Sequence, residues 1–184
     1  MKVTITGHTE GIGKSLADIF SANGYQVQGF SRATGHNIGD AGCRADIVAA
    51  SWDSSIFINN AYSVTEPFAQ CEMLFDIWES WKGKPKSIVN ISSSITERWQ
   101  NDFRELRYRT AKLALEEACE FLWNKNKNPH IMRVSPCRTD TPRTAASTDL
   151  NKADPDKFAA LVFHALTQDN FRVQTLNLAV NPLD

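Results

Sequence analysis

The sequence lacks the features that would place the chain in a membrane or on a nucleic acid. None of its 184 residues lies in an apolar run of the roughly 18 residues that a membrane-spanning helix needs. Lys and Arg number 20 and Asp and Glu number 21, so the net charge of −1 provides no basic field. We therefore expect a small-molecule partner and neither a nucleic-acid nor a membrane partner.

Cysteine is also too sparse for a disulfide or zinc framework. Cys43, Cys71, Cys119 and Cys137 form no CxxC pair, and none stands at metal-ligand spacing with a histidine. The opening residues, MKVTITG, lack the apolar segment of a signal peptide. These absences predict reduced thiols, no metal site and a soluble, cytoplasmic protein.

Strand and helix patterns alternate along the whole chain. Short apolar or β-branched runs predict strands at 2–6, 25–30, 55–58, 87–91, 131–134 and 173–180. Helical spacing of apolar residues predicts helices within 12–20, 74–81, 108–123 and 155–166. No repeat or linker interrupts this order. The sequence therefore predicts an α/β fold with a doubly wound parallel sheet, Rossmann-like, in a single domain spanning residues 1–184.

A glycine-rich turn follows the first predicted strand. The segment TGHTEGIG (6–13) lets the backbone approach a pyrophosphate, which the free amides at the helix start would face. Its G-x-x-x-G-x-G spacing differs from the G-x-G-x-x-G of many dehydrogenases, and a plain tight turn is the alternative. Residues 13–15, GKS, resemble the end of a P-loop, but that motif needs a glycine where this chain has His8.

A tyrosine, a lysine and a serine form a second candidate constellation. Tyr108 and Lys112 are spaced i, i+4 and therefore lie on one helix face. A nearby cation favours the phenolate and lowers the pKa of the phenol, which is about 10 in isolation. Ser93 follows the predicted strand 87–91, where ligands of parallel sheets bind. An exposed tyrosine beside a solvated lysine is the alternative interpretation of the pair.

Six segments in order resemble the short-chain dehydrogenase/reductase family over nearly the full length of the chain. They are TGHTEGIG (6–13), Asp46-Ile47, NNAY (59–62), IVNISS (88–93), YRTAK (108–112) and PCRTDT (136–141), and the stretch 173–178 resembles the family's final strand loosely. Tyr62 and Cys137 each stand where the family has glycine. The chain is short for a member of this family.

The resemblance implies a role for each matching residue. Tyr108 would be the general acid/base, Lys112 would lower its pKa and hold the nicotinamide ribose, and Ser93 would orient a carbonyl or alcohol. The cofactor-binding residues implied are Gly7, Thr9, Gly11, Ile12, Gly13, Ser31, Arg32, Asp46, Ile47, Asn59, Asn60, Ala61, Tyr108, Lys112, Pro136, Thr139 and Thr141. No metal is implied.

The expected activity is hydride transfer between a nicotinamide and a carbonyl or alcohol substrate. We expect NADP(H) to be preferred over NAD(H), because Arg32 follows the second strand, where an acidic residue would repel a 2′-phosphate. Residues 61–89 contain no asparagine for the family's proton relay. A catalytically weak or inactive dinucleotide-binding regulator is therefore the alternative.

Two further expectations concern assembly and substrate charge. Family members associate as dimers or tetramers, so a homo-oligomer is expected, with Trp78 and Trp81 either in the interface or in the core of the monomer. Six arginines cluster in sequence around Tyr108 and the segment 136–141: Arg98, Arg104, Arg107, Arg109, Arg138 and Arg143. Some of them could favour an anionic substrate, whereas exposed surface charges are the simpler interpretation.

Overall fold

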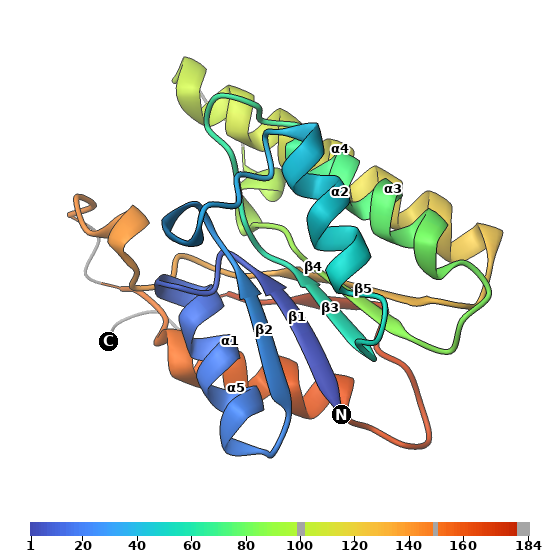
Figure 1. The fold of residues 1–184 in the computed structure, drawn as a ribbon. Helices are drawn as coiled ribbons and strands as arrows, with labels where there is room; N and C mark the ends of the chain where they lie inside the picture. The colour runs from blue at the N-terminus through green and yellow to red at the C-terminus, as the bar shows by residue number, and fades with distance from the viewer. Residues whose placement is uncertain (99–101, 149–150, 180–184) are drawn as a thin grey trace.

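The computed structural model describes residues 1–98, 102–148 and 151–179. Strands and helices alternate as the sequence predicts, with one more helix, α2, in a region where none was predicted (Figure 1). Their bounds are β1 Lys2–Thr6, α1 Gly11–Ala22, β2 Gln26–Phe30, α2 Ala41–Ala50, β3 Ile56–Asn59, α3 Ala69–Trp81, β4 Ser87–Ile91, α4 Phe103–Lys125, β5 His130–Ser135, α5 Pro155–Leu166 and β6 Thr175–Asn177, with short 3₁₀ turns η1 Arg32–Thr34, η2 Ser94–Glu97 and η3 Pro142–Thr144.

The six strands form one parallel sheet in the order β2-β1-β3-β4-β5-β6. The chain therefore places β2 on one side of β1 and then adds β3 to β6 on the other side of β1. Loops that leave β1 and β3 at their carboxyl ends diverge at this switch point and open a crevice between them. The expected doubly wound fold is confirmed.

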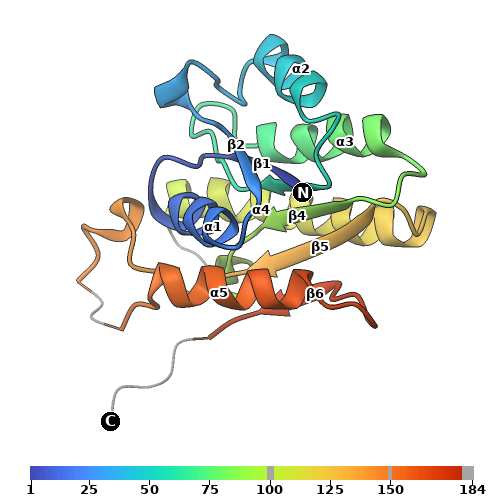
Figure 2. The ribbon, with the colours of Figure 1, turned by 60° about the horizontal axis from the view of Figure 1, so that its bottom comes forward.

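Helices cover both faces of the sheet (Figures 1 and 2). Side chains alternate between the faces along each strand, so Ile56 and Ile58 pack with α1 and α5, while Phe57 packs with α3 and α4. Leu16 of α1 and Val162 of α5 are fully buried in the first layer. The two cores hold the carboxyl ends of the strands in fixed positions.

The two tryptophans of α3 lie in the core of the single chain. Trp81 is fully buried against Phe57, with ring centroids 6.2 Å apart at 86°, and Trp78 is 2% exposed. Because both side chains are already buried within the single chain, they have almost no exposed surface left to contact a second copy of the protein. The interpretation of Trp78 and Trp81 as interface anchors is therefore wrong.

Three element boundaries differ from the predicted ones. The helix expected at 108–123 begins earlier, because the Asp102 carboxylate accepts hydrogen bonds from the amides of Arg104 and Glu105 and caps it. The last strand, expected at 173–180, pairs only over 175–177, and residue 180 lies outside the described residues. The second strand begins at Gln26 rather than Tyr25, whose ring packs against Phe20.

Within the described ranges no helix combines the length and apolarity needed to cross a membrane. The same residues hold no group of three or more His, Cys, Asp or Glu side chains able to bind a metal ion. All four cysteines are free thiols. Burial raises the pKa of Cys71 to about 11.

Candidate active site

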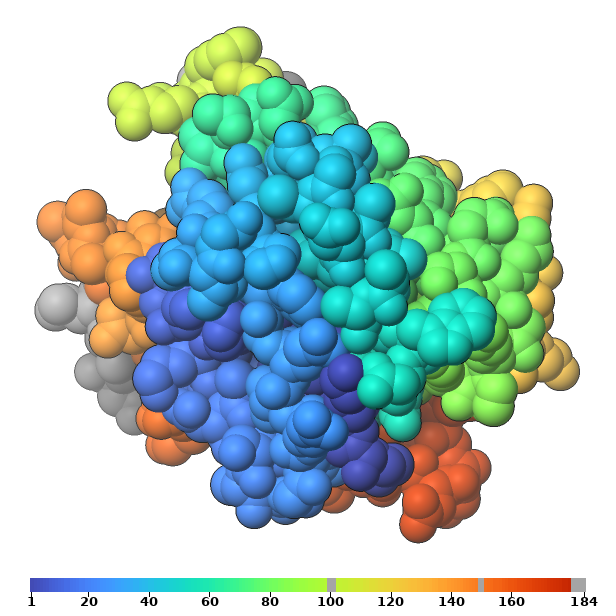
Figure 3. Space-filling view, in the orientation of Figure 1, coloured from blue at the N-terminus to red at the C-terminus, as the bar shows by residue number. Residues whose placement is uncertain are grey.

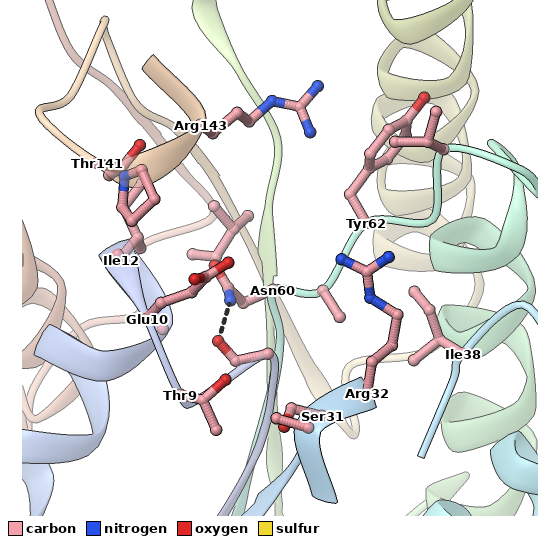
Figure 4. A pocket seen from close by; sticks show the side chains of 18 of the residues that line it. Thr9, Glu10, Ile12, Ser31, Arg32, Ile38, Asn60, Tyr62, Thr141 and Arg143 are labelled. Atoms are coloured by element: carbon pink, nitrogen blue, oxygen red, sulfur yellow. Dashed lines mark hydrogen bonds between the residues drawn. The ribbon is translucent and has the colours of Figure 1, made fainter. Parts of the chain in front are cut away.

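A cavity of about 540 Å³ opens at the carboxyl ends of β1, β2, β3 and β4 (Figure 4). Of the seventeen residues predicted to bind cofactor, thirteen line it: Gly7, Thr9, Gly11, Ile12, Gly13, Ser31, Arg32, Asn60, Ala61, Tyr108, Lys112, Pro136 and Thr141. The structure thus brings most of the predicted site into one pocket. Its size is ordinary for a ligand pocket, which typically holds about 300–1,000 Å³.

The glycine turn makes the floor of this pocket because side chains would not fit there. Gly7 has a positive φ of +71°, and a Cβ built on Gly13 would lie 2.0 Å from the Gly7 carbonyl oxygen. Asn60 donates its side-chain amide to the carbonyls of Thr6 and Gly7, at 3.0 and 3.2 Å, and so fixes the turn. No side chain caps the start of α1, so its first amides face the cavity.

The segment after β2 forms another part of the wall. Ser31 and Arg32 line the pocket, and Ser31 is held by reciprocal bonds with Thr34 in η1. Arg32 forms no ion pair within the described residues, and its side chain extends into the cavity in Figure 4. This end of the site therefore presents a cation and a hydroxyl.

The acidic pair expected at Asp46-Ile47 is not brought to the pocket. Both residues lie within α2, where Ile47 is fully buried in the core and Asp46 is exposed. His36, Asn37 and Ile38 line the cavity instead, just before the Asp40 cap of α2. Residues 31–40 connect β2 to α2, and His36, Asn37 and Ile38 within this connection form the part of the wall that Asp46-Ile47 was expected to form.

At the other end of the pocket, three side chains lie against the ring of Tyr108. The rings of Tyr62 and Tyr108 meet edge to face, with centroids 4.8 Å apart. The guanidinium carbon of Arg143 lies 4.1 Å from the Tyr108 ring centroid and 4.8 Å from that of Tyr62. Lys112 Nζ lies 5.4 Å from the Tyr108 centroid. Neither Tyr62 nor Arg143 was among the predicted site residues, although Arg143 was among the six clustered arginines.

Lys112 is buried and turned into the protein. Its Nζ donates to Gln70 Oε1 at 2.6 Å and to the Ile91 carbonyl at 2.7 Å. Burial, and secondarily the positive charge of Arg143, lower its pKa to about 7, while Glu116 opposes the shift. Near neutral pH, Lys112 is therefore present in both its protonated and its neutral form. Its two hydrogen-bond acceptors stabilise the protonated form.

Gln70 occupies the centre of this buried polar cluster. Its Nε2 donates to the backbone carbonyls of Asn59 and Ile91, at 2.7 and 3.0 Å. The backbone carbonyl of Gln70 in turn accepts from the Asn59 side-chain amide. Asn59 also donates to Asn90, so it supports the sheet end rather than lining the pocket. Sequence reasoning missed Gln70, because the helix predicted within 74–81 begins after it, whereas α3 begins at Ala69 and buries Gln70.

The pKa of Tyr108 is raised above its ordinary value of 10, mainly by burial. Arg143 and a side-chain hydrogen bond with Ser93 oppose that shift, whereas Tyr62 and Glu105 add to it. Arg143 is thus the cation that acts on the Tyr108 pKa in this structure, in place of the expected Lys112. Ser93 contacts Tyr108 without lining the cavity, and its Oγ accepts from the Ile95 amide at 3.3 Å.

A half-buried carboxylate holds the serine segment from behind. Glu116 accepts from Ser92 at 2.6 Å, from Thr96 and Ser135 at 3.2 Å each, and pairs with Arg133 at 3.2 Å. These bonds tie the ends of β4 and β5 to α4. The same helix carries Tyr108 and Lys112, so the tyrosine and the serine are fixed relative to one another.

The segment after β5 closes the pocket on the remaining side. Thr141 lines the cavity and packs on the glycine turn, since a Cβ on Gly11 would lie 3.2 Å from Thr141 Cβ. Figure 3 shows this orange segment lying against the blue start of α1. Thr139 does not line the cavity; it is buried, and its carbonyl accepts from Thr144 at 2.6 Å. This bond helps place η3, and with it Arg143.

No protein-family model matches the chain, and no curated protein does so either. Solved structures do match. A short-chain dehydrogenase from Burkholderia cenocepacia J2315 in complex with NADP has a TM-score of 0.79 at 16% identity, covering 96% of this chain and 95% of that one. A 3-alpha-hydroxysteroid dehydrogenase from Pseudomonas sp. B-0831 complexed with NADH has a TM-score of 0.80 at 16% identity, with 97% and 95% covered.

A structure described as ribose-5-phosphate isomerase from Brucella melitensis 16M is similar to the same degree, with a TM-score of 0.78 at 17% identity over 96% of this chain and 90% of that one. At such identities a likeness establishes the fold and leaves the activity to the residues of the site. The sheet order, the glycine turn at the switch point and these matches together show that the chain has the fold of the short-chain dehydrogenases/reductases.

Proposed function

We propose that the protein is an oxidoreductase that transfers a hydride between NADP(H) and a carbonyl or alcohol substrate. The observation that carries the proposal is the single cavity lined by the glycine turn at one side and by Tyr108 and Lys112 at the other. The uncapped start of α1 fits a pyrophosphate, because Gly11, Ile12 and Gly13 line the cavity there and the tight Gly7–Gly13 contact, which leaves no room for a side chain on Gly13, holds the turn in place. A bound nicotinamide would supply the hydride chemistry.

In the direction of reduction, Tyr108 gives its phenolic proton to the carbonyl oxygen while the carbonyl carbon accepts the hydride. Ser93 contacts Tyr108 from outside the cavity lining, so its part in orienting the carbonyl oxygen would be exerted through the Tyr108 hydroxyl. Lys112, two of whose N–H groups are bonded to Gln70 and Ile91, would donate the third to the ribose of a bound cofactor. Oxidation of an alcohol reverses each transfer, with Tyr108 accepting the proton.

Arg32 supports the preference for NADP(H) over NAD(H). Its guanidinium lines the cavity directly after β2, without a carboxylate partner among the described residues. A 2′-phosphate there would gain charge-assisted hydrogen bonds, whereas a 2′-hydroxyl would gain little. Titrating NADPH and NADH by fluorescence tests this preference, and tighter binding of NADH would contradict it.

Exchange of Tyr108 for phenylalanine tests the reaction. Tyr108→Phe keeps the ring and loses the proton, so NADPH oxidation with a panel of aldehydes and ketones should fall at least 100-fold, within the typical 10²–10⁴ contribution of general acid catalysis. Tyr25→Phe is the matched control, because Tyr25 packs against Phe20 outside the pocket. Equal activity in Tyr108→Phe and wild type would show that Tyr108 is not the acid. NADPH binding without turnover of any substrate in wild type would favour a regulatory protein.

We further propose that the protein is a homo-oligomer, in which α3 and α4 supply one contact. With Trp78 and Trp81 in the core, the proposal rests on apolar side chains that the monomer leaves exposed: Phe68 and Phe75 with Leu106, Leu113 and Phe121. These residues belong to α3, α4 and the residue before α3. Sedimentation equilibrium measures the outcome, and a monomer at micromolar concentration would refute the proposal.

A further inference from the structure

Arg143 lies closer to the Tyr108 ring than Lys112 does, at 4.1 Å against 5.4 Å from the ring centroid. It extends from η3 toward Tyr62 in Figure 4 and lies over both tyrosine rings. A guanidinium carries five N–H donors, so contact with two rings set at 80° to each other still leaves N–H groups available for a ligand. Arg143 lines the same cavity as Tyr108 and Lys112, so these donors belong to the site.

The positive charge of Arg143 has no ion-pair partner among the described residues. Arg44 and Arg133, by contrast, pair with Asp76 and Glu116 at 3.0 and 3.2 Å. Glu10 is the carboxylate in the pocket lining, and it belongs to the glycine turn. The charge of Arg143, 4.1 Å from the Tyr108 ring centroid, acts to lower the pKa of both Tyr108 and Lys112, so positive charge lies at the reacting end of the pocket.

We propose that Arg143 binds an anionic group of the substrate, so that the substrate class is carbonyl compounds or alcohols carrying a carboxylate or a phosphate. The planar fork of a guanidinium matches either oxyanion with two parallel hydrogen bonds. An anion there offsets the repulsion between Arg143 and the Lys112 ammonium. This inference rests on the proposed function, since it assigns the substrate end of the same pocket.

Binding without turnover gives the first test. Benzoate, phenyl phosphate and the neutral benzamide are titrated against the protein saturated with NADP⁺, with ligand-observed NMR as the readout. Benzoate or phenyl phosphate should bind wild type at least tenfold more tightly than Arg143→Gln, and benzamide should show no such ratio. Whichever anion binds more tightly identifies the source of the charge. Equal affinity of both anions for wild type and Arg143→Gln overturns the proposal.

Arg104→Gln is the matched control, because it removes the same charge from an exposed position on the first turn of α4, outside the pocket lining. It should keep the anion affinity of wild type. Arg143→Lys keeps the charge and loses the fork, so it should restore part of the affinity. Equal losses in Arg104→Gln and Arg143→Gln would make the effect a general one of net charge, which also overturns the proposal.

Turnover gives the second test. With 4-carboxybenzaldehyde and its methyl ester as a matched pair, wild type should favour the carboxylate in kcat/KM, and Arg143→Gln should lower that preference at least tenfold. NADPH affinity, measured in parallel, separates the two ideas. If NADPH does not bind, the proposed function fails; if NADPH binds and the carboxylate gives no Arg143-dependent advantage, the substrate inference alone fails.

Discussion

Replacing Gln70 should move the charge of Lys112 in a direction set by the new side chain. Two acceptors hold the ammonium: Gln70 Oε1 at 2.6 Å and the Ile91 carbonyl at 2.7 Å. A hydrogen bond to a charged group contributes about 1.5–3 kcal/mol. Since a pKa unit corresponds to about 1.4 kcal/mol, Gln70→Leu should lower the Lys112 pKa by about one to two units from about 7.

Gln70→Glu should act in the opposite direction. A carboxylate at hydrogen-bond distance stabilises the ammonium and typically shifts a pKa by about one to three units. The protonated form is lost as pH rises through the pKa of the folded protein. The ammonium form should therefore persist to higher pH in Gln70→Glu and disappear at lower pH in Gln70→Leu.

The assay is the pH dependence of NADPH affinity, with the ¹⁵N signal of Lys112 Nζ as a direct readout. The pH at which NADPH affinity falls on the basic side should be lowest in Gln70→Leu, intermediate in wild type and highest in Gln70→Glu. Because both substitutions remove the amide that donates to the carbonyls of Asn59 and Ile91, the unfolding of both variants in urea is measured alongside. Identical limbs in three folded proteins would refute the role of Gln70 in setting the Lys112 charge.

Three other substitutions test the core, the buried lysine and the glycine turn. The unfolding free energy of wild type should rise between pH 7 and 10, because Lys112 holds fewer protons folded, with its pKa near 7, than unfolded, where it is 10.5; urea titrations should show a flatter rise in Lys112→Met. Trp81→Ala should cost about 3–5 kcal/mol of stability in the same assay, since Trp81 is fully buried, while Trp52→Ala, at a residue 57% exposed, should cost far less; equal losses would contradict the assignment of Trp81 to the core. Gly13→Ala should weaken NADPH binding at least tenfold, because its methyl group cannot occupy a place 2.0 Å from the Gly7 carbonyl oxygen, and unchanged fluorescence titrations would contradict this geometry.

The sequence predicted best what depends on local pattern. The alternation of strands and helices and the glycine turn could be recognised because chain order and spacing define them, and the parallel sheet then brings Gly7, Asn60 and Tyr108 together. A loop of unpredicted length defeated the same reasoning. Asp46-Ile47 matched a pattern, yet the connection of residues 31–40 between β2 and α2 places Asn37 and Ile38 at the pocket and leaves Asp46-Ile47 within α2.

Side-chain neighbours from distant segments could not be predicted from the sequence. The apolar stripe of α3 identified Trp78 and Trp81 as anchors without telling whether their own sheet or a second copy covers them. Gln70 and Lys112 are separated by 42 residues, and their contact depends on how α3 and α4 pack. Arg143 was one of six arginines near the site in sequence, and only its position on η3 over Tyr108 distinguishes it from the others.

The position of β2 at the edge of the sheet has a consequence for local opening. It pairs with β1 alone, and its end reaches the pocket through Ser31, Arg32 and a bond from the Gly7 amide to the Phe30 carbonyl at 2.7 Å. Edge elements open at lower free energy than central ones and exchange their amide hydrogens sooner. A dinucleotide that bridges Gly7 and Arg32 would bind only the closed form, so it would slow amide exchange in β2 more than in the central strands β3 and β4. Ligand binding would thus stabilise the edge strand β2, which is paired on one side only.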